Sequence, residues 1–352
     1  MTKVYVGMSG GVDSSLTAAL LKEQGYSVVG VYMKNWTQDL PGMKCPWADD
    51  LADAKRVAVQ LGIDFKVFDF EAEYRDKVVQ YMIDEYKLGR TPNPDIMCNQ
   101  EVKFRLFLDA ALEDGADMIA TGHYARTSGG QLRMATDTNK DQTYFLYRVT
   151  GEALSKTLLP LGDYTKPEVR KMAEQRGLFT AAKKDSQGIC FVGQIGIREF
   201  LSQYVKTTPG DIIDQKSGKI LGRHDGAIFY TLGQRHGLNL GGGLPYYVVG
   251  KHMDSNQVYV STDLNDNSLW KQDVLLQDVN WINGAPAEGE YKIRVRHRAQ
   301  LAMANLSYVD DAVKLRLKEP QRAVTPGQSV VVYDDDLCLG GGIVRFLTDE
   351  RT

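Results

Sequence analysis

A segment rich in glycine and serine follows the first apolar run of the sequence. Residues 9–15 read Ser-Gly-Gly-Val-Asp-Ser-Ser, between a strand expected over 3–8 and a helix expected over 14–24. Glycines in such a turn let backbone N–H groups approach an anion, and the helix dipole behind them favours negative charge. The order differs from a Walker A loop, which carries a phosphate-binding lysine, and from the Gly-x-Gly-x-x-Gly dinucleotide fingerprint.

This segment predicts a phosphate-binding loop, because it stands where an open α/β sheet binds its ligands, at the carboxyl end of a strand. The plainer alternative is a capped turn without a ligand. Met33 and Gly122 fit the base of a nucleotide at the same edge of the sheet, since each lies at the end of an expected strand. The expected nucleotide site comprises Gly7, Met8, Ser9, Gly10, Gly11, Val12, Asp13, Ser14, Met33 and Gly122.

Four cysteines lie far apart, at Cys45, Cys98, Cys190 and Cys338, and no two form a Cys-x-x-Cys pair. A disulfide scaffold is not expected in a reducing compartment, and a structural zinc site would need paired ligands. Two interpretations remain open from the residues alone. The cysteines are small buried apolar side chains, or one or more of them is a reactive thiol.

The composition is typical of a globular protein with more than one domain. The chain has 352 residues, 43% of them hydrophobic and 25% charged. No apolar run is long enough to span a bilayer, and the first residues lack the apolar core of a secretory signal. We therefore expect a cytoplasmic protein with no membrane partner. The net charge of −3 does not exclude nucleic acid, because binding depends on a local basic patch.

Strands and helices alternate in the first half of the sequence, which predicts a doubly wound parallel sheet of the α/β class. The strands are expected over 3–8, 27–32, 64–68 and 117–121. The helices between them are expected over 14–24, 49–61, 71–88 and 103–113. A hairpin turning at Gly129-Gly130 follows, then a helix over 166–176 ended by Gly177, and a helix over 197–205.

Short β-type segments dominate from Pro209 onward. They are expected over 211–214, 227–231, 246–249 and 257–260, and again over 292–295, 312–317, 329–333 and 342–346. The polar stretch 263–268 between the two groups is interpreted as a linker. We expect three domains: a catalytic α/β domain over 1–200, a small, mostly β central domain over 201–270, and a C-terminal barrel or sandwich, with a barrel favoured, over 271–352.

Four local sequences, at 8–15, 93–104, 121–124 and 185–191, together resemble the bacterial tRNA-specific 2-thiouridylases, which are adenylating ATPases with a pyrophosphatase-type (PP) loop. The similarity runs in order through the whole chain. It implies ATP-dependent 2-thiolation of the wobble uridine of tRNA, in which the 2-oxygen is adenylated and then replaced by sulfur. It also implies Mg²⁺ entering with the nucleotide, no dedicated metal site in the protein, and a sulfur donor such as a cysteine desulfurase or a sulfur-relay protein.

The resemblance assigns roles to residues outside the loop. Cys190 corresponds to the persulfide carrier, Cys98 to its partner thiol, and Asp95 to a nearby acid/base. Two thiols within reach can resolve a persulfide by forming a disulfide, and release of free sulfide remains the alternative. Cys45 and Cys338 match no catalytic pattern, and we expect both to be spectators.

Contacts with tRNA are also implied by the resemblance. A base must leave its stack to react, and a loop pocket between domains would receive it. Residues 292–298 place alternate basic side chains on one expected strand face, which is either a solvated face or a phosphate contact. The residues expected to contact tRNA are Asn93, Pro94, Asp95, His123, Lys140, Asp141, Gln142, Arg296, His297 and Gln328.

Two other functions are weighed against this one. An amidotransferase-type synthetase would share the phosphate loop but needs an ammonia source, and no glutaminase-like segment is found in the sequence. A non-catalytic RNA-binding adaptor would use the β domains alone, and an intact phosphate loop argues against it.

Overall fold

The computed structural model describes residues 1–39, 45–184, 196–241 and 243–345. Its first region is built on a five-stranded, wholly parallel sheet in the order β3-β2-β1-β4-β7. These strands are β1 (Lys3–Gly7), β2 (Ser27–Lys34), β3 (Asp64–Asp69), β4 (Met118–Ala120) and β7 (Thr157–Leu158). We call this the α/β region.

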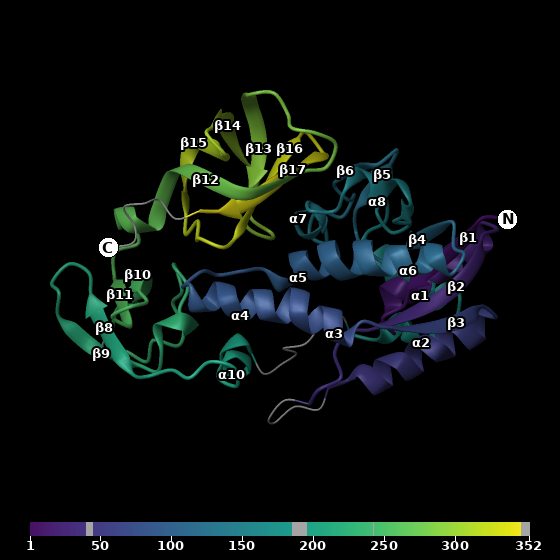
Figure 1. Ribbon diagram of the computed structural model, residues 1–352, viewed down its shortest axis with the longest axis horizontal. Coiled ribbons are helices and arrows are strands. Elements are labelled where there is room, and N and C mark those ends of the chain that lie inside the picture. Colours follow the sequence, from purple (N-terminus) through teal and green to yellow (C-terminus); the bar gives the residue numbers. More distant parts are fainter. Residues whose placement is uncertain (40–44, 185–195, 242, 346–352) are drawn as a thin grey trace.

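Helices cover both faces of this sheet, which confirms the doubly wound prediction (Figure 1). On one face Val4 and Val6 pack against α1 (Val12–Glu23) and α2 (Trp47–Leu61). Tyr5, between them in the strand, points to the other face and packs into the core formed with the later helices. Alternating direction along a fully buried strand is why both faces require an apolar layer.

Two long helices form the second layer. The first is continuous from Glu71 to Lys87, through α3 (Glu71–Tyr74), the π-helical η1 (Arg75–Val79) and α4 (Gln80–Lys87). The second runs from Pro94 to Glu113, through α5 (Pro94–Met97), the π-helical η2 (Cys98–Leu106) and α6 (Phe107–Glu113).

The second helix begins nine residues earlier than predicted. Asn93 caps it, since its side-chain oxygen accepts a hydrogen bond from the Asp95 N–H at 3.1 Å, and Pro94 occupies the first helical position. Asp95 and Cys98 therefore lie in the first turns of a helix and not in a preceding loop.

A hairpin and several short helices complete the α/β region. β5 (Arg126–Ser128) and β6 (Gln131–Arg133) turn at Gly129 and Gly130, as predicted, with φ of 57° and 77°. The helices are α7 (Thr143–Leu146), α8 (Gly151–Ser155), α9 (Lys166–Gln175), the 3-10 turn η3 (Phe179–Ala182) and α10 (Ile197–Leu201). The last is shorter than the expected 197–205.

The central region is a four-stranded sheet in the order β10-β11-β8-β9. Its strands are β8 (Gly210–Asp214), β9 (Ile220–His224), β10 (Tyr247–His252) and β11 (Gln257–Ser261). The strand predicted over 227–231 is wrong. It is the 3-10 turn η4 (Ala227–Phe229), whose Ala227 and Ile228 are buried, so burial and not strand pairing explains its apolar composition.

The C-terminal region is a closed six-stranded barrel, entered through the 3-10 turn η5 (Asn267–Leu269). Its strands are β12 (Trp270–Trp281), β13 (Gly289–Arg294), β14 (Ala302–Val309), β15 (Ala312–Arg322), β16 (Ser329–Asp334) and β17 (Leu337–Val344). β12 closes it by pairing with both β15 and β17. The barrel prediction is confirmed.

The barrel and the α/β region share one sheet and one core. β17 pairs with β6, so the hairpin β5–β6 extends the barrel sheet. Ile282, Tyr333 and Cys338 of the barrel belong to the same apolar cluster as the two long helices. Among the helices of the described part of the chain, none is long and apolar enough to cross a bilayer.

Candidate functional site

The loop at the start of α1 has the form of an anion site. Gly11 is the N-cap residue and makes no side-chain cap hydrogen bond, and Asp13 is the acidic residue in the first turn of the helix. The Ser9 N–H donates to Ser14 Oγ at 3.1 Å, and Ser15 Oγ donates to the Gly11 carbonyl at 2.7 Å. The serine hydroxyls thus make hydrogen bonds within the loop itself.

Close backbone contacts hold the loop in place. Gly10 has φ of 73°, and a Cβ there would collide with the Asp50 carbonyl of α2. A Cβ on Gly122, after β4, would lie 2.9 Å from both the Asp13 carbonyl carbon and the Ser14 nitrogen. Both glycines are therefore required by packing around the loop, whatever binds there.

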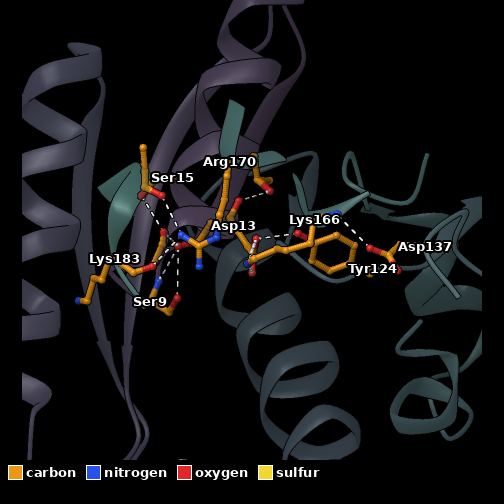
Figure 2. A network of polar contacts seen from close by, with 12 residues as sticks. Ser9, Asp13, Ser15, Tyr124, Asp137, Lys166, Arg170 and Lys183 are labelled. Carbon is orange, nitrogen blue, oxygen red and sulfur yellow. Dashed lines mark hydrogen bonds and ion pairs between the residues drawn. The ribbon is translucent and has the colours of Figure 1, made fainter. Parts of the chain in front are cut away.

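Asp13 is the charged centre of the loop (Figure 2). Its carboxylate accepts hydrogen bonds from the Tyr124 hydroxyl at 2.8 Å and from Lys166 Nζ at 2.7 and 2.8 Å. Lys166 opens α9, and its own N–H donates to Asp137 at 2.9 Å. The lysine side chain is only 10% exposed, so the cation is held beside the loop.

Sequence reasoning missed Tyr124 and Lys166 as partners of Asp13. The Thr-Lys-Pro start of α9 was a signal for a helix N-terminus, and Tyr124 follows the predicted strand end at Gly122. Neither signal shows that both side chains converge on a carboxylate more than a hundred positions away.

The far side of the loop is bordered by the turn η3 and the residues after it. Lys183 Nζ contacts Asp50 at 2.9 Å and Asp53 at 2.8 Å, both in the first turns of α2. Arg170 donates to the carbonyls of Ala181 and Lys183 (Figure 2). The chain is thus anchored beside the loop just before residues 185–195, and Cys190 lies outside the described residues.

Cys98 and Asp95 lie one helical turn apart in the helix that begins at Pro94. Cys98 is buried, 2% exposed, and Asp95 is partly buried. Burial raises the pKa of Asp95, and the nearby charge of Lys103 partly opposes this. A carboxyl with a raised pKa holds a proton at higher pH, which suits an acid/base role.

His123 lies beside the same lysine. Burial, and then the charge of Lys103, hold the pKa of His123 well below its usual range, so its ring is neutral near pH 7. His123 Nδ1 shares a hydrogen bond with Thr121 Oγ1 at 2.7 Å, and its ring lies 5.5 Å from that of Phe104. Lys103, which was not predicted, therefore acts electrostatically on both Asp95 and His123.

The two methionines of the expected nucleotide site have different surroundings. Met8 is buried, and its N–H donates to the Val31 carbonyl at 2.8 Å. Met33, near the carboxyl end of β2, is partly exposed, and its Cε lies 2.9 Å from where a Cβ on Gly7 would be.

Models of one protein family match nearly the whole chain. They are described as a tRNA methyl transferase HUP domain over residues 2–194, a tRNA methyl transferase PRC-barrel domain over 198–262, and an aminomethyltransferase beta-barrel domain over 271–344. The tRNA-specific 2-thiouridylase MnmA of Bacillus thuringiensis (strain Al Hakam) is 47% identical over 97% of this chain and 94% of its own. The chain belongs to the MnmA family.

A second relative agrees with this membership. MnmA of Bacillus cytotoxicus is similar to the same extent, 47% identical over 97% of this chain and 94% of its own. A solved 4-thiouridine synthetase–RNA complex with bound ATP covers 58% of this chain and 50% of that one, at 19% identity and a TM-score of 0.37.

Two of the expected tRNA contacts in this MnmA family member have internal partners. The Asp141 side chain is 1% exposed and contacts Arg294 of the barrel at 2.6 Å, while Gln142 Oε1 accepts from the Tyr124 N–H at 2.8 Å. Lys140 and Gln328 are partly exposed. In this structure Asp141 therefore joins two regions of the protein and is not presented to a ligand.

The basic strand face expected over 292–298 is not formed. β13 ends at Arg294, which is buried against Asp141, and the chain then turns. Arg296 is exposed beyond the strand. His297 is partly buried with its ring 4.5 Å from Phe145, and burial lowers its pKa. Basic side chains therefore alternate only as far as the end of β13. There Arg294 is buried against Asp141, across the contact between the barrel and the α/β region.

The two cysteines expected to be spectators are buried. Burial raises the pKa of Cys45 and, more strongly, that of Cys338, so neither is a ready thiolate. Within the residues that the structure describes, no group of three or more His, Cys, Asp or Glu side chains is placed to hold a metal ion.

Proposed function

We propose that this protein is an ATP-dependent tRNA 2-thiouridylase acting on the wobble uridine. The observation that carries the proposal is the uncapped glycine loop of α1, with Asp13 and Lys166 beside it, in a chain 47% identical to proteins named for this activity. Residues 1–200 would form the catalytic domain, 201–270 the central domain, and 271–352 a barrel that contacts tRNA.

The first step would be adenylation of the base. The uridine 2-oxygen attacks the α-phosphorus of ATP, the bond to pyrophosphate breaks, and the N3 proton of the uridine leaves. Asp95 is the group we assign to this proton, because burial raises its pKa. The loop over Gly7–Ser14 would hold the phosphates, with Met33 and Gly122 near the adenine.

Lys166 and Asp13 suit the charge changes of this step. Lys166 would neutralise phosphate charge from its fixed position, and Asp13 is the carboxylate nearest the loop. Mg²⁺ takes few protein ligands when it arrives with a nucleotide, so a single carboxylate such as Asp13 would suffice.

The second step would transfer sulfur. The terminal sulfur of a Cys190 persulfide attacks C2 of the base and AMP leaves. The Cys98 thiolate then attacks Cys190 Sγ, which forms a Cys98–Cys190 disulfide and releases the thiolated base; Asp95 returns the proton to N3. A thiol reductant must reduce the disulfide, and a sulfur donor, such as a cysteine desulfurase or a sulfur-relay protein, must reload Cys190.

Base and RNA contacts complete the proposal. Asn93, Pro94 and Asp95, at the start of their helix, would shape the pocket for the flipped base, with the neutral ring of His123 nearby. Lys140, Gln142, Arg296, His297 and Gln328 are partly or fully exposed and would contact tRNA. Asp141 would act indirectly, through Arg294.

Methyl transfer is the second candidate, because the matching family models are described by that activity. A phosphate loop for α-phosphate chemistry is not needed for methyl transfer, which makes thiolation the better supported reaction. The two products differ in mass, since one exchanges oxygen for sulfur and the other adds a methyl group.

The test is a reconstituted reaction with the full chain, unmodified tRNA, ATP and a sulfide or persulfide donor. Pyrophosphate release and the mass of the wobble nucleoside are measured together. Cys190→Ser should release pyrophosphate but make no thiolated base, and Cys98→Ser should accumulate sulfur-loaded enzyme. Cys45→Ala is the control and should behave as the wild type. Methylated product, or thiolation by Cys190→Ser, would refute the assignment.

A further inference from the structure

The three regions of the protein meet at the short segment 88–92, which connects α4 to α5. Figure 1 shows this connection passing between the central sheet and the barrel. The segment directly precedes Asn93, the residue that caps the helix carrying Asp95 and Cys98. Contacts that fix the segment 88–92 therefore also fix the start of that helix.

One glycine from each region lies at this junction, and each has a positive φ: Gly89, Gly233 and Gly327, at 75°, 81° and 87°. A Cβ on Gly89 of the α/β region would lie 2.6 Å from Met253 Cγ of the central region. A Cβ on Gly233 of the central region would lie 2.8 Å from Ala323 Cβ, beside the barrel strand β15.

The third contact joins Gly327 of the barrel to the α/β region. A Cβ there would lie 2.7 Å from Arg90 Cβ and 2.8 Å from the Thr91 nitrogen. At Gly327 the obstructing atoms include backbone, whereas at Gly89 and Gly233 they are the side chains of Met253 and Ala323. The contact between the barrel and the segment 88–92 is therefore the one that leaves least room for an added side chain.

Thr91 is bonded to both of the other regions. Its N–H donates to the Pro326 carbonyl of the barrel at 2.9 Å, and its hydroxyl shares a hydrogen bond of 3.2 Å with the hydroxyl of Thr231 in the central region. Thr91 lies two residues before Asn93, and Pro326 lies two residues before Gln328, which is expected to contact tRNA.

We propose that Thr91 is a positioning residue for the thiol site, by which we mean Asp95 and Cys98. Through Thr91, the barrel and the central region fix the start of the helix that carries these two residues. The link to thiolation rests on the proposed function. The physical reason is that reacting groups must be held to a fraction of an ångström, and a helix cannot be better placed than its first turn.

Reactivity of the Cys98 thiol tests this positioning without any assumption about the reaction. Gly327→Ala should displace the 88–92 segment, open the buried Cys98, and raise its alkylation rate by about 5- to 30-fold. The rate is read from the Cys98 peptide by mass spectrometry. Gly284→Ala is the matched control, because Gly284 is also in the barrel with φ of 100° and a Cβ there would meet nothing within 4 Å.

A milder pair of variants decides the matter if Gly327→Ala does not fold. Thr91→Val removes only the hydroxyl contact to Thr231, and should raise Cys98 alkylation by about two- to tenfold; Thr91→Ser keeps the hydroxyl and should restore the wild-type rate. In single-turnover thiolation, the rate for Thr91→Val should fall while tRNA affinity and ATP affinity stay at the wild-type values.

Unchanged Cys98 alkylation in folded Gly327→Ala, or in Thr91→Val, would overturn the proposal. Equal increases in Gly327→Ala and Gly284→Ala would also overturn it, since strain alone would then explain them. If alkylation rises as expected while the wild-type protein forms no thiolated tRNA, the proposed function fails and the positioning by Thr91 stands.

Discussion

The side chains of Asp13 and Asp95 have different surroundings. The Asp13 carboxylate accepts hydrogen bonds from Lys166 Nζ and from the Tyr124 hydroxyl next to the glycine loop. Asp95 is partly buried, and the charge of Lys103 only partly offsets the cost of ionising it. The raised pKa of Asp95 supports the proposed role of this carboxyl as the proton carrier.

The raised pKa of Asp95 predicts a pH-dependent stability difference. The protonated carboxyl is favoured in the folded protein, so its contribution to stability is complete below its ordinary pKa of 3.8 and is lost as pH rises through the raised value. Asp95→Asn should therefore raise the melting temperature at neutral pH, and the gain should shrink as the solution is acidified. Thermal melts from neutral pH down to the ordinary pKa of an aspartate test this, with a variant of the exposed Asp311, Asp311→Asn, as the control. A gain independent of pH would contradict it.

Arg296 should contribute one phosphate contact. It is exposed beyond the end of β13, unlike Arg294. Arg296→Ala should weaken tRNA binding and lower the slope of log affinity against log salt by about one. A salt titration of tRNA affinity measures this, and Arg316→Ala, on an exposed part of β15, should leave the slope unchanged. An equal slope for Arg296→Ala would make it a solvated side chain.

At the scale of elements, the site depends on where strands end and helices begin. The phosphate loop lies at the β1–α1 junction, and Gly122 follows β4, the neighbour of β1 in the sheet. The helix from Pro94 starts at a cap and a proline and brings Asp95 and Cys98 to its first turns. At both places, hydrogen bonds between side chains and backbone help to fix the start of a helix.

Gly122→Ala should damage the phosphate loop selectively. The added Cβ would press on the backbone at Asp13 and Ser14, and overpacking of this kind costs about 1–3 kcal/mol. If that cost falls on the nucleotide-bound form, ATP affinity should drop by about tenfold or more. Calorimetric titration of ATP measures it. Gly241→Ala is the control, because a Cβ there would meet nothing within 4 Å, and equal ATP affinity in both variants would contradict the loop assignment.

For the whole molecule, the barrel is part of the α/β region's structure and not a loosely attached module. The Tyr144 hydroxyl donates to the Ser329 carbonyl at 2.9 Å, and Asn280 donates to the Tyr147 carbonyl at 2.9 Å. The Arg294–Asp141 pair is buried inside this contact. A barrel fixed in this way would hold the proposed tRNA contacts at a constant distance from Asp95 and Cys98.

Breaking the buried pair should be costly. Arg294→Ala would leave the Asp141 carboxylate buried without its cation, which costs about 3–5 kcal/mol. The same change at Lys292, in the same strand, removes an exposed pair with Asp335 and should cost about 0–1 kcal/mol. Denaturant unfolding of both variants makes the comparison. A double variant, Asp141→Asn with Arg294→Met, should recover part of the loss, and equal stability of the two single variants would contradict the argument.

Local patterns in the sequence determined the doubly wound sheet, the hairpin at Gly129-Gly130 and the place of the phosphate loop, because each depends on the backbone preferences of neighbouring residues. Tertiary structure alone decided that Lys166 and Tyr124 meet Asp13, that Asp141 is buried against Arg294, and that Thr91 is held from two sides. These partners are far apart along the chain, and only the packing of the apolar clusters within and between the regions brings them within hydrogen-bonding distance.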